Sequence, residues 1–294
     1  MSLFPSFARP RSLAQASELL ASLTSGKIII AGGQEIMPSV NTGVLQPDVY
    51  VDIGSLRELH GITIDEESGM LAIGALTVHR ELQTHALVHL HAPLLAESAR
   101  QAGGGRQVHN RGTIGGNIVA MHPLYDIAPA LLALQAELEM LKDGELTRTP
   151  LSQVLTDTNH GLGSDAILVR VLLRPMNPNA GSSYEKLKMS GGAYGSANAA
   201  AIIELSGSTI ASVRLCVGAV AEQLIDASAV AAFLSGSNWT DDAAEKLKAA
   251  VSALVTQPLS DQQGAGDWRT AMAGVVAARA CAAAVKNAQS DGAQ

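Results

Sequence analysis

The segment KIIIAGGQEIMP, residues 27–38, places three consecutive isoleucines directly before two adjacent glycines. A run of β-branched residues favours a buried strand, because these side chains pack well on a pleated, covered surface. Gly32 and Gly33 end that strand, and glycine permits both positive φ and a close approach to the main chain. The segment therefore predicts a strand and a tight turn, which is either an ordinary strand-to-helix connection or a phosphate-binding turn.

The composition indicates a folded globular protein that binds small molecules or other proteins. The chain has 294 residues, of which 47% are hydrophobic, enough for one large core or about two to three smaller ones. Its net charge is −7 and it has no block of lysine and arginine, which argues against nucleic acid or anionic membrane as a partner. No signal-peptide core and no stretch of about 20 apolar residues is present, so we expect a cytoplasmic protein without a membrane span.

The cysteine and histidine content argues against a metal site in this chain. Cys216 and Cys281 are too few for a disulfide framework, a zinc knuckle or the four thiolates of an iron–sulfur cluster. If electrons pass through the chain, another kind of group must carry them. His85, His89 and His91 lie close together in HALVHLHAP without an acidic or thiol partner, so we interpret them as a solvated helix end.

Changes of pattern divide the chain into three parts, at residues 1–54, 55–176 and 177–294. The first part contains a helix in RSLAQASELLASL with Ser12 as N-cap, then the isoleucine strand and a strand in DVYVDIG. In the second part we expect strands in GITID, MLAIGAL and AILVRVLL, and helices in LLAESARQA and DIAPALLALQAELEML. The third part follows the break RPMNPNAGSS and contains strands in NAAAIIEL and SVRLCVGAV. It ends in two alanine-rich helices, TDDAAEKLKAAVSAL, capped by Thr240, and WRTAMAGVVAARACAAAVKNA.

The sequence does not support any of the standard nucleotide-binding or nucleophile motifs. A Walker A loop is excluded because Gly26-Lys27 is followed by Ile28, which has no hydroxyl for magnesium. The segment GLGSDA, residues 161–166, fits a relaxed dinucleotide fingerprint, but a strand-like segment follows where that fold needs a helix. A G-x-S-x-G elbow is also missing. We therefore assign no catalytic residue.

A second glycine-rich element, NRGTIGGNI at residues 110–118, offers several groups suited to phosphate. Thr113 supplies a hydroxyl, Gly115 and Gly116 supply unshielded backbone, and the Asn117 amide both donates and accepts. Because both glycine elements are flanked by apolar, strand-like residues, we expect two loops that close on one diphosphate, with plain tight turns as the alternative. Downstream, Asp126 precedes a long apolar run and is either a helix N-cap or a contact for ligand hydroxyls.

Taken in this order and spacing, AGGQEIMP, RGTIGGNI and DIAPALLAL resemble the FAD-binding subunit of the molybdenum hydroxylases. This is the family of xanthine dehydrogenase, carbon monoxide dehydrogenase and the bacterial N-heterocycle dehydrogenases, and the resemblance covers nearly the whole chain. It implies an α+β fold in which two subdomains, residues 1–54 and 55–176, enclose FAD in the manner of vanillyl-alcohol-oxidase or PCMH-type flavoproteins. An α+β C-terminal domain at residues 177–294 follows.

The resemblance also assigns residues to the cofactor. It implies that the two glycine elements hold the FAD pyrophosphate, and that the aspartate of D-x-x-P and the lysine of Y-x-K contact FAD. It further implies a tyrosine against the isoalloxazine ring, for which ordinary core packing is the alternative. The residues assigned in this way are Ile29, Ile30, Ala31, Gly32, Gly33, Gln34, Glu35, Ile36, Thr113, Ile114, Gly115, Gly116, Asn117, Asp126, Lys186 and Tyr194.

Two positions depart from the family pattern. His109 stands where the family commonly has an arginine, and Gly103 replaces a usual apolar residue. Because histidine titrates near neutrality, His109 raises the hypothesis that FAD binding or partner docking depends on pH.

The resemblance implies an electron-transfer subunit that has no catalytic acid or base of its own, because the cofactor supplies the chemistry. A molybdenum cofactor on a large subunit and two 2Fe–2S clusters on a small subunit would complete a complex, as a dimer of heterotrimers. An external acceptor would take the electrons: NAD, a quinone, a cytochrome or oxygen, with NAD less favoured because a tyrosine over the flavin hinders nicotinamide stacking. The alternatives are a free-standing flavin reductase for a cell-wall precursor, for which no proton donor is identifiable, and a non-redox scaffold that has lost FAD.

Overall fold

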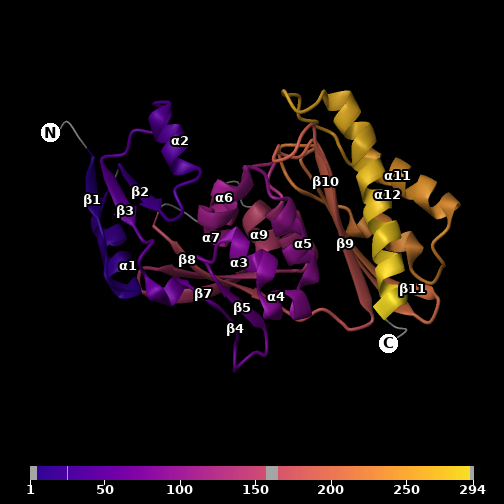
Figure 1. Cartoon of the computed structure of the whole chain (residues 1–294), viewed down its shortest axis with the longest axis horizontal. Coiled ribbons are helices and arrows are strands. Elements are labelled where there is room, and N and C mark those ends of the chain that lie inside the picture. Colours follow the sequence, from indigo (N-terminus) through magenta and orange to yellow (C-terminus); the bar gives the residue numbers. More distant parts are fainter. Residues whose placement is uncertain (1–4, 25, 157–164, 292–294) are drawn as a thin grey trace.

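The computed structural model describes residues 5–24, 26–156 and 165–291, and its elements form three groups that lie side by side (Figure 1). Each group is built around its own β-sheet. The two glycines of the fingerprint-like segment GLGSDA lie outside the described residues.

The first group is a three-stranded parallel sheet in the order β1-β3-β2 with two helices. Its strands are β1 (Ser6–Ala8), β2 (Lys27–Ile30) and β3 (Val49–Asp52), and its helices are α1 (Leu13–Ser22) and α2 (Ile36–Asn41). The Ser12 hydroxyl accepts a hydrogen bond from the backbone N–H of Gln15, which caps α1 as the sequence predicts. Ala16 and Leu20 bury the inner face of α1 against Val51 of β3. The predicted helix and both predicted strands are confirmed, whereas β1 was not predicted.

The second group is an antiparallel sheet in the order β4-β5-β8-β6-β7, accompanied by short helices. The strands are β4 (Ile62–Ile64), β5 (Leu71–Gly74), β6 (Glu137–Lys142), β7 (Glu145–Pro150) and β8 (Ile167–Leu173). The helices are the 3-10 turn η1 (Arg57–Leu59), α3 (His79–Thr84), α4 (Ala86–His91), α5 (Pro93–Gln101), α6 (Gly105–Arg111), α7 (Ile114–Ala120), α8 (Ile127–Ala133) and α9 (Leu151–Thr156).

Two expectations for this group are wrong. The helix expected throughout DIAPALLALQAELEML stops at Ala133, because the chain turns at Gln135, where φ is +54°, and continues as strand β6. The second glycine element is not a loop between strands, because its Ile114–Asn117 stretch forms the first turn of helix α7. In both places a buried apolar run fits a helix or a strand equally well, so tertiary pairing decides.

The third group is an antiparallel sheet in the order β12-β11-β10-β9 with helices on both faces. Its elements are β9 (Ala180–Leu187), β10 (Ala197–Ser206), β11 (Thr209–Gly218), β12 (Ile225–Asp226), α10 (Ser228–Ala231), the 3-10 turn η2 (Ala232–Leu234), α11 (Asp241–Ala253) and α12 (Gly266–Asp291). Helix α12 covers one face, as Figure 1 shows, while α5 and α8 of the second group pack against β9 and β10. Glycine in β9 permits the close packing of α12: a Cβ atom on Gly181 would lie 2.1 Å from the carbonyl oxygen of Ala284 in α12. The predicted strands and both alanine-rich helices are confirmed, and Thr240 caps α11.

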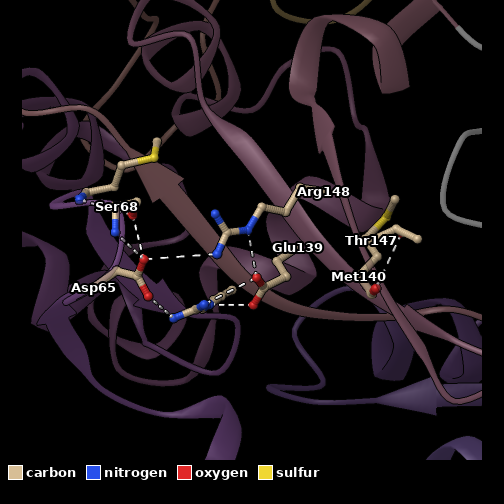
Figure 2. Close-up of polar contacts among 8 residues, drawn as sticks. Asp65, Ser68, Glu139, Met140, Thr147 and Arg148 are labelled. Carbon is tan, nitrogen blue, oxygen red and sulfur yellow. Dashed lines mark hydrogen bonds and ion pairs between the residues drawn. The ribbon is translucent and has the colours of Figure 1, made fainter.

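Four charged side chains form a closed ring on the second sheet (Figure 2). Arg170 of β8 contacts Asp65 at 3.0 Å and also binds Glu139 of β6. Arg148 of β7 lies 3.0 Å from Glu139 and 4.0 Å from Asp65. Burial alone would raise the pKa of Glu139, but hydrogen bonds from Arg170 and Arg148 hold this pKa below its ordinary value. The ring therefore fastens β6, β7 and β8 to the turn after β4.

The histidine segment HALVHLHAP contains the whole of helix α4, and His85 joins α3 to α4. His85 Nδ1 accepts a hydrogen bond from the N–H of Leu87, and a ring nitrogen of His89 lies 2.8 Å from the carbonyl oxygen of Gln83. Across the part of the chain that the structure describes, no three His, Cys, Asp or Glu side chains gather as metal ligands would. Nor does any helix in that part have the length and apolar character needed to cross a bilayer.

Candidate functional site

A cavity of about 360 Å³ lies between the first and second groups and is bordered by the loop before β10. Both glycine elements contribute to its walls. Of the residues that the sequence assigns to a cofactor, thirteen line the cavity: Ile29, Ala31, Gly32, Gly33, Gln34, Glu35, Ile36, Thr113, Gly115, Gly116, Asn117, Asp126 and Tyr194.

The first glycine turn makes direct contact with the chain that leads into α7. A Cβ atom on Gly32 would lie 1.9 Å from the carbonyl oxygen of Arg111, so only glycine allows the two segments to meet. Gly33 has φ of +71°, a left-handed conformation that turns the chain from β2 into α2. The two glycine elements, far apart in the sequence, therefore form one continuous wall.

The first turn of α7 forms the second part of that wall. Thr113 is its N-cap, and the hydroxyl accepts a hydrogen bond from Gly116 N–H at 3.0 Å. Gly115 packs closely against Ala75, the residue after β5. Its N–H donates to the Ala75 carbonyl at 2.9 Å, and a Cβ on Gly115 would lie 2.8 Å from Ala75. Asn117 lines the cavity, and its buried Oδ1 has no hydrogen-bond partner among the described residues. This oxygen is available to accept a hydrogen bond from a ligand.

Asp126 borders the cavity and belongs to a buried polar network. It occupies the N-cap position of α8, but its side chain makes no capping hydrogen bond. Instead the carboxylate accepts hydrogen bonds from Lys186 Nζ at 2.9 Å, the Tyr184 hydroxyl at 2.7 Å and Gly103 N–H at 3.2 Å. Lys186 also donates to the carbonyl of Gln101 at 2.9 Å. The predicted N-cap position is confirmed, but the side chain does not cap the helix, since the carboxylate binds Tyr184 and Lys186 on β9.

Burial acts against both charges of this pair. It raises the pKa of Asp126, while the Lys186 ammonium and the hydrogen bonds from Tyr184 and Gly103 oppose that rise. Burial also lowers the pKa of Lys186, and the Asp126 carboxylate opposes that change. The two side chains thus depend on each other to remain charged inside the protein.

Three of the assigned residues do not line the cavity, namely Ile30, Ile114 and Lys186. Ile114 is fully buried in the core of the second group, and Lys186 reaches the cavity only through Asp126. Sequence reasoning missed other lining residues, among them Lys27 and Ile28, directly before the first glycine turn, and residues of segments that only the fold brings to the cavity: Ile53, Ala75, His79, Val108, Tyr125 and Ala166–Leu168. Among the residues of those segments, only Tyr125 carried a usable signal, as one of the chain's few aromatic residues directly before Asp126.

An aromatic cluster lies at one end of the cavity. The ring of Tyr125 stacks on His122 with centroids 4.9 Å apart, and Tyr194 lies 6.0 Å from Tyr125 and 5.8 Å from His122. Tyr194 remains 40% exposed, which argues against the ordinary core packing considered for it. A Cβ on Gly103 would lie 3.1 Å from the Tyr194 ring, so the glycine at this departure from the family pattern makes room for the tyrosine.

Two histidines lie at the cavity wall, one lining it and one next to it. His79 lines the cavity, and burial, assisted by the nearby His109, lowers its pKa from 6.5 to about 4. His109 lies 2.8 Å from the carbonyl oxygen of Ala102 through Nε2 and 3.0 Å from Gln83 Nε2 through Nδ1. The Gln83 amide nitrogen is a donor, so Nδ1 of His109 accepts from it while Nε2 donates to the Ala102 carbonyl.

Comparison with known proteins agrees with this architecture. Residues 4–175 match the family model described as the FAD binding domain in molybdopterin dehydrogenase, and residues 182–284 match the CO dehydrogenase flavoprotein C-terminal domain. The chain belongs to the FAD-binding medium subunits of the molybdenum hydroxylases. It is therefore an oxidoreductase subunit, and the resemblance inferred from its glycine motifs is confirmed.

Relatives of this medium-subunit family match over almost the full length of the chain. The carbon monoxide dehydrogenase medium chain of Hydrogenophaga pseudoflava is 32% identical over 276 residues, which cover 94% of this chain and 95% of the relative. The glyceraldehyde dehydrogenase medium chain of Sulfolobus acidocaldarius is 29% identical, with 94% and 96% covered. A solved structure of the Hydrogenophaga carbon monoxide dehydrogenase superposes with a TM-score of 0.91 at 31% identity, covering 98% of this chain and 99% of that one.

The residues at the cavity fit the FAD that the matched domain implies. Gly32 and Gly115 lie where side chains would collide with neighbouring backbone, and the unpaired Asn117 oxygen faces the same space. Tyrosine rings at one end offer a flat apolar surface. An elongated ligand with a diphosphate and a flat ring system matches this distribution of groups.

Proposed function

We propose that this chain is the electron-transfer subunit of a molybdenum-containing hydroxylase or dehydrogenase. In this proposal it holds FAD and passes electrons from iron–sulfur clusters on a partner to an external acceptor. The observation that carries the proposal is the joined wall of the cavity, in which Gly32 touches the backbone of Arg111 beside the first turn of α7. FAD, when bound, supplies redox chemistry that no side chain at this site supplies.

We further propose a division of roles among the residues of the chain. The turn at Ile29–Ile36 and the segment Thr113–Asn117 would hold the diphosphate through backbone N–H groups and the Asn117 amide. Asp126, fixed by Lys186, would accept hydrogen bonds from hydroxyl groups of the cofactor. Tyr194 would lie against the flavin ring, where its half-exposed position supports contact with a ligand.

The proposed partners are a large subunit with the molybdenum cofactor and a small subunit with two 2Fe–2S clusters, assembled as a dimer of heterotrimers. The relatives support this arrangement by their names: two are medium chains, and one solved structure is described as a carbon monoxide dehydrogenase that lacks the Mo-pyranopterin moiety of the molybdenum cofactor. Both cysteines of this chain are buried and free, which agrees with clusters carried elsewhere. The acceptor remains external to the chain.

An absorption spectrum of the protein purified from its native source, with a gel of the proteins that copurify, tests this proposal. We expect a flavin spectrum, release of FAD by acid, and one larger and one smaller companion chain. A flavin-containing protein that purifies alone would favour a free-standing reductase. A colourless protein that also fails to take up added FAD would contradict the cofactor assignment.

A further inference from the structure

A hydrogen bond at the cavity joins the first group to the second. The Tyr125 hydroxyl donates to Oε2 of Glu35, although the two residues lie 90 positions apart. Glu35 belongs to the first glycine turn, and Tyr125 lies on the segment between α7 and α8. Both residues are among those that line the cavity, so the bond joins two parts of its wall.

Neither partner of this bond is committed elsewhere by its local structure. Glu35 occupies the N-cap position of α2 and makes no side-chain capping hydrogen bond. Its carboxylate accepts the hydrogen bond from Tyr125 instead. The helix that follows therefore does not hold this side chain.

The Tyr125 ring is held in position by its aromatic neighbours. It stacks on His122, whose Nδ1 accepts a hydrogen bond from the backbone N–H of Leu124 at 3.2 Å. Tyr194 of the third group completes the cluster, with its ring centroid 6.0 Å from Tyr125 and 5.8 Å from His122. The bridge from Glu35 through Tyr125 thus connects a residue from each of the three groups.

The bridge keeps its donor over the working pH range. Burial, and then the hydrogen bond and charge of Glu35, raise the pKa of the Tyr125 phenol above its ordinary value, so the hydroxyl stays protonated. A hydrogen bond to a charged acceptor contributes more than a neutral one, and partial exposure reduces that contribution. The bridge is therefore suited to closing the cavity reversibly.

We propose that Tyr125 and Glu35 form a clasp that retains the cofactor and positions Tyr194 at the end of the cavity. Tyr125 is a positioning residue in this proposal, because it acts through Glu35 and Tyr194. The proposal rests on the proposed function, since it takes FAD to be the ligand behind the clasp. It adds a determinant of cofactor retention, Tyr125, that lies outside both glycine motifs.

The test is the rate at which FAD leaves the full-length chain, followed by the rise in flavin fluorescence after dilution. Tyr125→Phe removes the hydroxyl and keeps the ring, and we expect it to speed FAD release by roughly tenfold, as the loss of one hydrogen bond to a charged group would. Tyr50→Phe is the matched control, because Tyr50 stacks on Phe7 with centroids 4.6 Å apart and is not among the described lining residues. It should release FAD at the parent rate.

A double-mutant cycle with Glu35→Gln identifies the partner. If the two side chains act as a pair, the effects of Tyr125→Phe and Glu35→Gln on the release rate will be smaller together than the product of the single effects. A Tyr125→Phe rate within twofold of the parent, or strictly multiplicative effects, would overturn the clasp while leaving FAD binding intact. A parent protein that binds no FAD would instead overturn the proposed function and the clasp with it.

Discussion

Lys186 and Asp126 form a salt bridge of 2.9 Å across 60 residues of sequence, and neither side chain exposes more than 1% of its surface. The pair joins β9 of the third group to the start of α8 in the second. Because Asp126 also borders the cavity, the contact that fastens the third group to the second lies directly beside the site.

Replacing one partner of this pair should destabilise the protein strongly. Lys186→Met leaves a buried carboxylate without its counter-charge, and we expect a loss of about 3–5 kcal/mol in the free energy of unfolding, measured by urea denaturation of the FAD-free chain. The double variant Lys186→Met/Asp126→Asn should recover much of that loss. Arg174→Met, which breaks an exposed pair with Glu137, is the control and should cost less than about 1 kcal/mol. Equal losses for Lys186→Met and Arg174→Met would contradict this prediction.

Acid should destabilise the folded protein through His79. Its folded pKa of about 4 lies below the unfolded value of 6.5, so the unfolded chain binds a proton that the folded chain does not. The stability that His79 contributes is therefore complete above pH 6.5 and declines as the pH falls toward 4, by about 3 kcal/mol over that window. Urea denaturation at several pH values should show this decline in the parent and a weaker one in His79→Gln. Substitution of the exposed His60 by glutamine is the control, and a His79→Gln profile identical to the parent would sink the idea.

The two glycines of TIGGN should respond differently to alanine. At Gly115 the new Cβ would lie 2.8 Å from Ala75, so Gly115→Ala should cost about 1–3 kcal/mol of stability. At Gly116 the Cβ would meet only the Thr113 hydroxyl, at 3.0 Å, and alanine favours a helix over glycine. Gly116→Ala should therefore retain the parent melting temperature and weaken FAD binding. A lower melting temperature for Gly116→Ala than for Gly115→Ala would contradict the assignment of Gly115 to packing against Ala75 and of Gly116 to FAD binding.

The charged ring should stabilise the second sheet without affecting the cofactor. Glu139→Gln removes the charge that faces both Arg148 and Arg170, and we expect a loss on the order of 2 kcal/mol in urea denaturation with an unchanged FAD affinity. Since hydrogen bonds from the arginines lower the pKa of Glu139, its contribution is present above the ordinary glutamate pKa and declines as the pH falls through the folded value. Glu145→Gln, on the exposed edge strand β7, is the control. Altered FAD affinity in Glu139→Gln would show that the ring acts on the site.

Local sequence patterns predicted the elements whose partners lie nearby. Ser12 and Thr240 cap the helices that follow them, and the isoleucine run forms β2, because cap residues and β-branched runs act within a few positions. The run after Asp126 was misjudged because β6 exists only through pairing with β7 and β8, which no local pattern specifies. Strand β1 is likewise defined by its pairing with β3, about 40 residues later in the chain.

The two glycine motifs located one long part of the cavity wall, but they did not define how the cavity is closed. Eleven of the thirteen assigned residues that line it lie in these motifs, since each motif is contiguous and carries its own turn chemistry. Tyr125, His79 and Ile167 were missed because they reach the cavity from separate elements that the fold alone brings together. Lys186 was assigned to the cofactor but does not line the cavity, and it acts on the site only through its salt bridge to Asp126.

The contact between Gly32 and the carbonyl of Arg111 is made by the backbone of the chain alone. Such a cleft is preorganised, so little backbone entropy remains to be lost when a cofactor settles into it. Affinity then depends on the groups that face the ligand and not on folding around it. A single missing methyl group at position 32 thus has a thermodynamic effect on binding out of proportion to its size.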